Sequence, residues 1–581
     1  MKRSILTFGT AGLFCLSLLL STFASAQTFE NTFGSLANHD TPQDGKPIPN
    51  GRYIVLSNTL SYSNASRILL TRLAANGSVN MHATIHDINS PNTHYYGTAI
   101  ELDRDAAGTH TGYFIAGSRS TPNGRQAILI RTNTSGTPTW VKLMPNTDAG
   151  GALVENGVSV ERQSNGDVIL TVSGYSPSAN NYRFTVARFN SGGGQLWSNR
   201  YYGTDSGQSF EATEACNAVR SGAATIVVTG RSWTSGSPDH HTFLSCIDAA
   251  TGAELWRRNY NSNMTRDAGI DVVYKPANGA AEPAALMVVG AAGLQASVMW
   301  VIRANPLNGI ASTKFYSPNI AFISFRGLAV NLDVNGTRAV VAGDIISQPV
   351  PGGNNLNGTF AMLLPFYGTE LPDWTYYFSS TSPQIDSPRS ISPVSGASAG
   401  YFLTCGTNLT GSAFHDAHAV RMDQLGGIGA GACPTQPLTV ARTVQGVSGW
   451  RSFNRTPQGW TNIVLTRTAQ SFAQETCTPE LGEAGEERSE APSFGDADAL
   501  LYPNPVGNGR DAVLQVNLPE AAGVQIQAFD LAGRLVWSQQ SAPAAGETQI
   551  SLPAAQWAPG VYVISLRTEA INRSWKLVVG E

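Results

Sequence analysis

Two short groups of histidine and aspartate are the first residues whose chemistry could make a site. Imidazole and carboxylate groups bind divalent metals and transfer protons, so the two groups together could form a metal centre or an acid–base pair. Each group lies after a short apolar segment, where we expect a connection between strands. Polar surface connections also contain such residues, and this structural explanation stays open. The candidate ligand-binding residues are Asp239, His240, His241, His415, Asp416, His418 and Trp233.

Linear catalytic motifs are missing from the sequence. It has no Gly-x-Ser-x-Gly elbow, no His-Glu-x-x-His pair, no phosphate-binding loop and no dinucleotide fingerprint. The segments Asp205–Gly207 and Asp333–Gly336 are incomplete as calcium loops and are more simply turns. We therefore expect no cofactor, with a divalent metal at the histidine groups as the open alternative.

Aromatic residues are a second kind of candidate, because exposed rings stack on the faces of sugars. Tyr95–Tyr96, Tyr175, Tyr201–Tyr202 and Trp233 fall in connections between expected strands. Nearby Asn and Asp side chains could bond sugar hydroxyls. For Tyr201–Tyr202, packing between neighbouring sheets is the more natural explanation.

An internal repeat must position these candidates. Its first element is an apolar strand ending in or near glycine, as in Phe114–Gly117, Leu170–Gly174, Ile226–Gly230, Met287–Gly290, Val340–Gly343 and Phe402–Gly406. Its second is a strand ending in a turn glycine, and these glycines are 57 or 59 residues apart. Trp140, Trp197 and Trp256 each follow their glycine by four residues. The turn glycines are Gly77, Gly136, Gly193, Gly252, Gly309, Gly368 and Gly427.

This repeat predicts four-stranded antiparallel sheets. The continuous apolar strand should be covered on both faces, and the tryptophan should begin an outermost strand and cover the edge of its sheet. Radial stacking of such sheets gives a β-propeller of seven or eight blades over residues 27–477, and the repeat resembles secreted bacterial propellers. Asn462–Thr466 would be the central strand of a partial eighth blade, and Thr28–Phe33 an outermost strand that completes the last blade.

The N-terminus has the features of a secretory signal peptide at residues 1–26. Met1–Arg3 is basic, Ile5–Phe23 is uncharged and apolar or small, and Ala24–Ala26 gives a small-x-small cleavage site. Export permits disulfides, and we expect a bond between Cys433 and Cys477. Cys216 with Cys246 is a further possible pair, which leaves Cys405 as a buried thiol.

The C-terminal part differs in composition. Residues 478–497 are rich in Glu, Gly, Ala and Ser, which predicts an acidic flexible linker. Residues 498–581 contain short alternating strands about 10–15 residues apart, which indicates a small Ig-like β-sandwich. Motif residues within it are Tyr502, Pro503, Asn504, Pro505, Asp530, Gly533, Arg534, Gly560, Tyr562 and Lys576.

These motifs resemble the type A C-terminal sorting domain of the type IX secretion system. Its pattern is Tyr-Pro-Asn-Pro, then Asp-x-x-Gly-Arg, then Gly-x-Tyr, then an apolar strand containing lysine. The resemblance implies Sec export, passage across the outer membrane with the type IX machinery as partner, and a secreted or surface location. The chain ends in Glu581 where the family often has a basic residue, which leaves the final fate of the tail open.

Composition limits the partners. Charged residues are 13% of the chain and the net charge is −4, without basic clusters, which argues against nucleic acid. No segment after the signal peptide could span a membrane. We favour a binding or adhesive module for extracellular polysaccharide or protein, since no catalytic motif is present. The alternatives are a polysaccharide lyase or hydrolase, tested by substitution of His241 or His418, and a structural component of the cell surface.

Overall fold

A computed structural model gives the fold, and it divides the chain into two compact units, Met1–Glu480 and Leu481–Glu581. Within the residues described, no helix is long and apolar enough to cross a membrane. The structure describes residues 28–34, 40–60, 65–87, 90, 92–121, 124–144, 154–176, 180–203, 207–262, 264–279, 282–293, 297–318, 322–347, 357–367, 371–378, 387–396, 399–407, 416–425, 435–437, 440–445, 453–457, 461–462, 466–469, 473–476, 499–502, 506, 511–518, 524–530, 534–541, 546–567 and 572–579.

Seven groups of four consecutive antiparallel strands make up the first unit as described, and we call them repeats 1 to 7. Repeats 2 and 3 are joined into one sheet by a parallel pairing of Val154 with Arg125. Repeats 1 and 2 are β2 (Asp40–Ile48), β3 (Arg52–Thr59), β4 (Arg67–Leu73), β5 (Val79–His86) and β6 (His94–Arg104), β7 (His110–Thr121), β8 (Gly124–Asn133), β9 (Pro138–Leu143). Repeats 3 and 4 are β10 (Val154–Arg162), β11 (Val168–Ser176), β12 (Asn181–Phe189), β13 (Gln195–Gly203) and β14 (Gln208–Arg220), β15 (Ala223–Thr234), β16 (His241–Asp248), β17 (Glu254–Tyr260).

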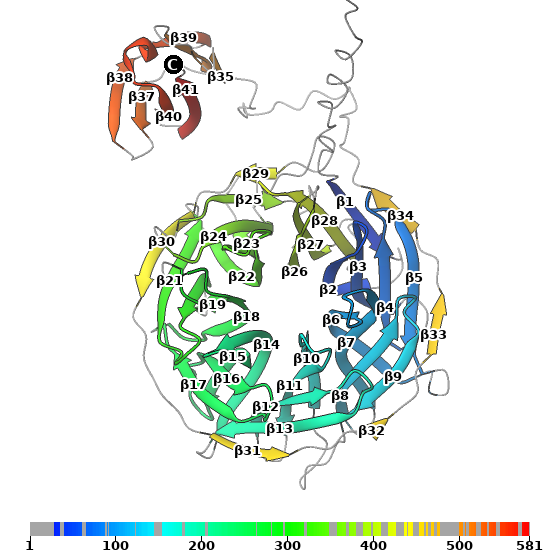
Figure 1. Ribbon diagram of the computed structural model, residues 1–581. Coiled ribbons are helices and arrows are strands. Elements are labelled where there is room, and N and C mark those ends of the chain that lie inside the picture. Colours follow the sequence, from blue (N-terminus) through cyan, green and yellow to red (C-terminus); the bar gives the residue numbers. More distant parts are fainter. Residues whose placement is uncertain are drawn as a thin grey trace, which may run out of the picture. The chain divides into compact units, whose positions relative to one another are not determined.

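The later repeats have the same strand order. Repeats 5 and 6 are β18 (Ala268–Lys275), β19 (Ala285–Ala292), β20 (Val298–Ala304), β21 (Ala311–Pro318) and β22 (Phe322–Leu332), β23 (Arg338–Ser347), β24 (Asn357–Pro365), β25 (Trp374–Phe378). Repeat 7 is β26 (Ser387–Val394), β27 (Gly400–Thr407), β28 (Asp416–Asp423) and β1 (Phe29–Gly34). Figure 1 shows the repeats arranged around a central opening, with the first strand of each repeat nearest to it.

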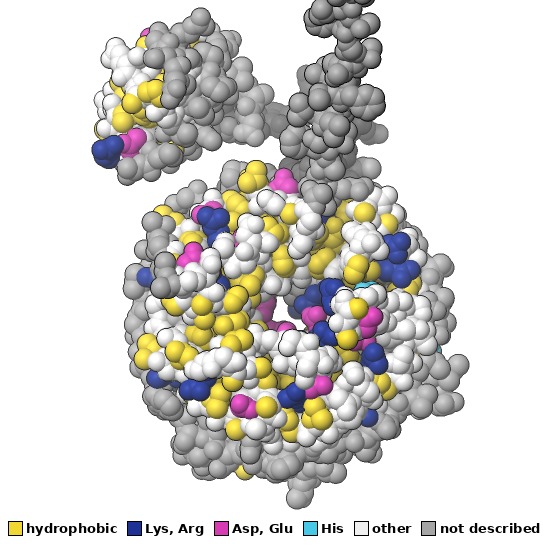
Figure 2. All heavy atoms as spheres, in the orientation of Figure 1, with side chains coloured by type: hydrophobic (Ala, Val, Ile, Leu, Met, Phe, Trp, Pro, Cys, Tyr) yellow, Lys and Arg dark blue, Asp and Glu magenta, His cyan; other side chains and the backbone are white. Residues whose placement is uncertain are grey.

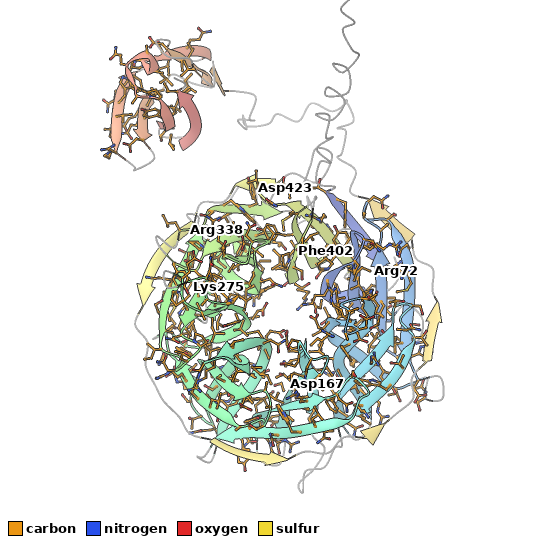
Figure 3. All side chains as sticks on the ribbon, in the orientation of Figure 1. Arg72, Asp167, Lys275, Arg338, Phe402 and Asp423 are labelled. Carbon is orange, nitrogen blue, oxygen red and sulfur yellow. The ribbon has the colours of Figure 1, made fainter. Side chains whose placement is uncertain are left out.

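Apolar side chains from neighbouring repeats pack together at every junction. The second strands are apolar on both faces because each face meets a different neighbour: in β11, Leu170 packs toward repeat 2 and Ile169 toward repeat 4. The same holds between the last repeat and the first, where Phe402 of β27, labelled in Figure 3, packs with Tyr53 of β3. Coverage of the apolar strand on both faces, expected from its sequence, is therefore confirmed.

The tryptophans near the turn glycines lie near the starts of the outermost strands of their repeats, as expected for Trp197 in β13 and Trp256 in β17, and they also contact the following repeat. The Trp197 indole N–H donates to the carbonyl of Ala249 at 3.1 Å, and Trp256 donates to Pro306 at 3.0 Å. Gly252 has a φ of +66°, and a Cβ there would lie 2.7 Å from the Trp197 ring. The turn glycine and the tryptophan one repeat earlier therefore form a single contact between repeats.

A series of short strands pairs with the outer edges of the sheets. Six short strands at residues 435–476 each add a fifth strand to a repeat. They are β29 (Thr435–Pro437) on β25, β30 (Val440–Gln445) on β21, β31 (Phe453–Pro457) on β13, β32 (Thr461–Asn462) on β9, β33 (Thr466–Ala469) on β5 and β34 (Ala473–Thr476) on β1. Figure 1 shows them along the outer rim, where they pair backbone groups of edge strands.

This arrangement corrects the expectation for the end of the repeat region. The described ends of Asn462–Thr466 pair with β9 and β5, at the edges of repeats 2 and 1, so these ends do not belong to an eighth sheet. Residues 463–465 lie outside the described residues. The N-terminal strand β1 pairs with β28 as an outermost strand, as expected, and the sheet it completes is the seventh.

Cysteine pairing is partly decided by the fold. Cys216 of β14 and Cys246 of β16 both lie opposite Val227 of β15, so one strand separates them. Two strand spacings are about 9–10 Å, beyond the reach of a disulfide, so the Cys216–Cys246 pair is wrong. Cys405 is a buried thiol as expected. Cys433, Cys477, the signal peptide and the linker lie outside the described residues.

The second unit contains two sheets that share one core. The first sheet is β35 (Ala499–Tyr502), β36 (Ala512–Leu518) and β39 (Gly546–Leu552), and the second is β38 (Leu535–Ser541), β37 (Val524–Asp530), β40 (Gly560–Arg567) and β41 (Asn572–Val579). A 3-10 helix, Ala554–Gln556, follows β39. Leu514 and Ile550 of the first sheet belong to the same buried cluster as Ile526 and Ile564 of the second.

Candidate functional site

The first strand of every repeat carries a β-bulge at an equivalent position, beside the central opening. In β10, for example, the register with β11 shifts between Gly157 and Ser159. A bulge inserts one unpaired residue and re-aims the side chains around it. The inserted residues, which we call the bulge residues, are Gln43, Thr98, Val158, Thr213, Ile270, Leu328 and Arg389.

All seven bulge residues line a single cavity of about 500 Å³, which we call the mouth cavity. Its wall also includes residues at the starts of β10 and β14 and at the hairpin between β11 and β12. Because neighbouring strands are antiparallel, the start of each first strand and the hairpin between its second and third strands lie on one face. The mouth cavity therefore opens on that face. The further wall residues that the site uses are Asn156, Ser173, Tyr175, Tyr182, Glu211, Glu214 and Asp271.

Tyr175 and Tyr182 form the aromatic part of this wall. Tyr175 is the last but one residue of β11 and Tyr182 is the second residue of β12, and their ring centroids are 4.8 Å apart. Tyr182 packs against Trp233 of repeat 4 at 5.2 Å, so the pair is held by the neighbouring repeat. The Tyr175 hydroxyl donates to Asn180 Oδ1 at 3.0 Å, and burial raises the pKa of Tyr182. Both rings are half-buried and keep part of their surface exposed.

Trp233 supports Tyr182 from behind and does not itself line the mouth cavity. Its ring stacks on His240 with a centroid distance of 4.8 Å and an interplanar angle of 22°. The Arg231 guanidinium lies 5.5 Å from the Trp233 centroid and forms an ion pair with Glu211. Burial, together with the charge of Arg231, lowers the pKa of His240. His240 is therefore a neutral ring that positions Trp233.

The other histidine and aspartate candidates are not brought together. Asp239 is exposed in the connection before β16, and His241 is the half-buried first residue of that strand. His418 lies within β28, not in a connection, and is 6% exposed. Asp416 begins β28, and His415 lies outside the described residues. Asp239, His240, His241 and His418 do not line the cavities at the opening, and the described residues contain no cluster of three or more His, Cys, Asp or Glu placed to hold a metal.

A second cavity of about 340 Å³ lies deeper, and we call it the channel cavity. It shares Gln43, Thr98, Glu214, Asp271 and Arg389 with the mouth cavity, so the two are neighbours along the opening. Figure 2 shows acidic and basic side chains gathered around this central hollow. The charged residues of the channel wall are Asp44, Lys46, Glu101, Glu161, Glu214, Asp271 and Arg389.

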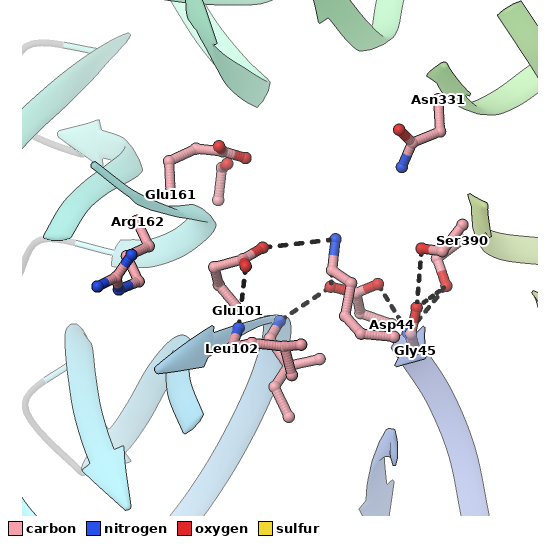
Figure 4. A network of polar contacts seen from close by, with 12 residues as sticks. Asp44, Gly45, Glu101, Leu102, Glu161, Arg162, Asn331 and Ser390 are labelled. Atoms are coloured by element: carbon pink, nitrogen blue, oxygen red, sulfur yellow. Dashed lines mark hydrogen bonds and ion pairs between the residues drawn. The ribbon is translucent and has the colours of Figure 1, made fainter. Parts of the chain in front are cut away.

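Lys46 sits among the carboxylates of the first two repeats. Its Nζ is 3.9 Å from Asp44 Oδ2 and 3.9 Å from Glu101 Oε2 (Figure 4). The Lys46 and Glu101 side chains keep 25% and 27% of their surface exposed to the channel. Burial lowers the pKa of Lys46, but the charges of Asp44 and Glu101 outweigh it and the pKa is raised. Lys46 is therefore a fixed cation that is shared between these two carboxylates.

Carboxylates that follow a bulge also join neighbouring repeats. Asp44 accepts hydrogen bonds from the N–H of Gly45 at 2.7 Å and from the N–H of Ile100 in repeat 2 at 2.9 Å. Asp271 does the same with Val272 at 2.6 Å and with Val330 of repeat 6 at 2.7 Å. The bulge leaves backbone donors unpaired, and these side chains satisfy them.

The pKa values of several channel carboxyls are raised. Burial raises the pKa of Glu161 to about 8, with a further contribution from the charge of Glu101. Burial raises the pKa of Asp271 to about 7, and it raises the pKa of Glu214 as well. These groups interact, so they titrate as a coupled set and hold protons at neutral pH. Such a set can donate or accept protons, or gain charge when a cation enters.

Sequence reasoning found Tyr175 and Trp233 but missed Tyr182 and the whole ring of bulges. The innermost strands carry no continuous apolar segment, because one of their faces meets the polar opening. A signal was present in the spacing of the residue before each bulge, which recurs every 55 to 61 residues and is often glycine. These residues are Pro42, Gly97, Gly157, Ala212, Gly269, Gly327 and Pro388.

Comparison with protein families identifies the C-terminal region. Residues 500–580 match the family described as secretion system C-terminal sorting domain. This match supports the expected type IX secretion substrate, and with it an exported protein that acts at the cell surface or beyond it. No curated protein matches the chain.

The motif residues of this region are found in its strands and turns. Tyr502 ends β35, and Gly560 begins β40. Tyr562 donates its hydroxyl to the carbonyl of Ala558 at 2.7 Å, and Arg534 pairs with Asp530 at 2.7 Å across the turn after β37. Lys576 lies in β41 opposite Val563. Pro503, Asn504, Pro505 and Gly533 lie outside the described residues.

Proposed function

We propose that residues 27–477 form a seven-bladed β-propeller and that residues 498–581 form a small Ig-like β-sandwich. Seven consecutive four-stranded repeats, with an apolar cluster even between repeat 7 and repeat 1, support the propeller. One cavity lined by a bulge residue from every repeat supports a common axis. Two sheets around one core support the sandwich.

We propose the following route for the protein. Residues 1–26 direct Sec-dependent export, the acidic linker at 478–497 separates the two domains, and the C-terminal domain carries the propeller across the outer membrane. The match of residues 500–580 to sorting domains supports this route. The propeller then acts on ligands outside the cell.

The function that the site supports best is binding of an extracellular polysaccharide at the mouth cavity. The observation that carries this proposal is the pair Tyr175 and Tyr182 in the wall of a cavity that also contains amide, hydroxyl and carboxylate groups. Aromatic rings bind the apolar faces of sugars, while amide, hydroxyl and carboxylate groups bond their hydroxyls. Asn156, Ser173 and Glu211 supply such groups beside the two rings.

The size of the cavity fits this use. A volume of about 500 Å³ lies in the range of pockets that hold small ligands or short segments of a chain. The packing of Trp233 on Tyr182 fixes the aromatic wall before a ligand arrives. A prearranged wall reduces the entropy lost on binding.

A polysaccharide-degrading enzyme is the second candidate, and one observation favours it. A carboxyl with a pKa near neutrality can act as a general acid in glycosidic bond cleavage, and burial raises the pKa of Glu161 to about 8. The residues involved would then be channel carboxyls and not the histidines first considered. Cleavage products distinguish this candidate from a binding module.

The test is a binding and cleavage assay on the purified chain from residue 27 onward with a panel of polysaccharides. We expect retention of at least one glycan without a change in its length. Tyr182→Ala should weaken that binding about tenfold, because the ring supplies stacking and area, while Tyr182→Phe keeps both and should bind like the parent. Shortened products would instead support the enzyme. Failure to retain any glycan would contradict glycan binding and direct the search to protein ligands.

A further inference from the structure

Carboxyl groups outnumber cations in the walls of the mouth and channel cavities, and this excess bears on which glycan the proposed site binds. Glu214 and Asp271 line both the mouth cavity and the channel cavity, so they form the floor where the two meet. Tyr182, in the wall of the mouth cavity, contributes the aromatic surface. A sugar bound at that wall would have these two carboxylates among its neighbours.

Compensating cations are too few for the carboxylates at this floor. Lys46 lies 3.9 Å from both Asp44 and Glu101, and its charge also acts on Glu161 and Glu214. Arg231 pairs with Glu211 at the rim. The channel wall therefore holds five carboxyls, those of Asp44, Glu101, Glu161, Glu214 and Asp271, against two cations, Lys46 and Arg389.

We infer that the mouth cavity selects glycans that carry amino groups, with a sugar ring on the Tyr175–Tyr182 wall and its ammonium group against Glu214 and Asp271. An ammonium group in a partly buried site gains more from nearby carboxylates than it would in water. A uronate or sulfate group would find no opposite charge at these carboxyls and would be repelled by the fraction of them that is ionised. The inference rests on the proposed glycan site and names the class of glycan that the site takes.

Proton linkage supports the same assignment. Burial raises the pKa of Asp271 to about 7, so this carboxyl keeps part of its protons at neutral pH in the empty site, and burial raises the pKa of Glu214 in the same direction. An ammonium group stabilises the ionised form of both carboxyls, so its binding releases protons. A neutral glycan lacks this effect and should bind without proton release.

The experiment is calorimetry of the purified chain from residue 27 onward at neutral pH with three probes. These are a β-1,4-linked glucosamine oligomer, its N-acetylated counterpart of equal length, and an oligogalacturonate. We expect the amine oligomer to bind at least about tenfold more tightly than the acetylated one, with protons released in buffers of different ionisation enthalpy. The oligogalacturonate should not bind. Added salt should reduce the difference between the first two probes.

Two substitutions distinguish the effect of the carboxyls at the cavity floor from the effect of other charges on the same face of the molecule. Glu214→Gln should bring the amine and acetylated oligomers to within about threefold of each other. Asp239→Asn removes an exposed carboxylate of the same face outside the cavity and should leave the preference unchanged. If Glu214→Gln does not fold, the proton count and salt dependence of the parent chain still decide the matter.

Two negative results have different meanings. Equal binding of all three probes would overturn the charge preference and leave the glycan site standing. If none of these probes binds and the wider polysaccharide panel is also negative, the proposed function itself fails. Tighter binding of the oligogalacturonate than of the amine oligomer would contradict the inference directly.

Discussion

Replacement of Glu161 by glutamine should make the stability of the propeller less dependent on pH. Burial raises the pKa of Glu161 from 4.5 to about 8, so the folded chain favours the protonated carboxyl. Below pH 4.5 both the folded and the unfolded chain are protonated, and ionisation imposes no cost. Stability is then lost as the pH rises toward 8, because only the unfolded chain ionises freely.

The magnitude follows from the two pKa values. The difference between 4.5 and about 8 sets a ceiling of about 5 kcal/mol on the free energy of unfolding lost at high pH. Glu161 is only half-buried and faces a cavity, so we expect about 1–2 kcal/mol after solvent screening. Asn217 Nδ2 donates to Glu161 Oε2 at 2.9 Å, and a glutamine oxygen can accept the same bond.

The assay is denaturant unfolding of the parent chain and of Glu161→Gln at pH 5 and pH 9. We expect similar stability at pH 5 and a more stable variant at pH 9. Asp239→Asn, which removes an exposed carboxylate, should follow the parent at both values. Parallel pH dependence of Glu161→Gln and the parent chain would refute the account of the channel carboxyls.

Two further predictions concern the contacts that hold the repeats. Gly252→Ala should lower the free energy of unfolding by about 2–4 kcal/mol, measured by thermal or denaturant unfolding, because φ is +66° and the Trp197 ring leaves no room for a Cβ. The control Gly222→Ala, at φ +83° with nothing within 4 Å, should lower it by about 1 kcal/mol. Equal losses in the two variants would contradict the role of the tryptophan. Lys314→Cys with Val444→Cys should form a disulfide detectable by mass spectrometry, because these residues are directly opposite in β21 and β30. Lys314→Cys with Thr443→Cys should not, and efficient bonding in this control would argue against the observed register.

Sequence reasoning recovered the parts of the fold whose pattern repeats strongly. The apolar second strands and the turn glycines identified repeated sheets, because burial on both faces demands continuous apolar residues. Leu170 and Ile169 show this directly, since they pack toward different repeats. The motifs from Tyr502 to Lys576 identified the export domain, which the family match supports.

Other features depend on contacts that a single strand does not reveal. The short strands at residues 435–476 pair through backbone groups with distant edges, and no side-chain pattern marks that choice. Tyr182 was missed because its position in the cavity wall depends on where β10 and β14 lie. His418 was expected in a connection, but β28 extends far enough to bury it.

The most direct test of the central claim is an experimental structure of the chain with a bound oligosaccharide from the polysaccharide panel. We predict density for a sugar ring against Tyr175 and Tyr182 in the mouth cavity, with Glu214 and Asp271 nearest its polar groups. A sugar bound only at another surface, with the mouth cavity empty, would contradict the account.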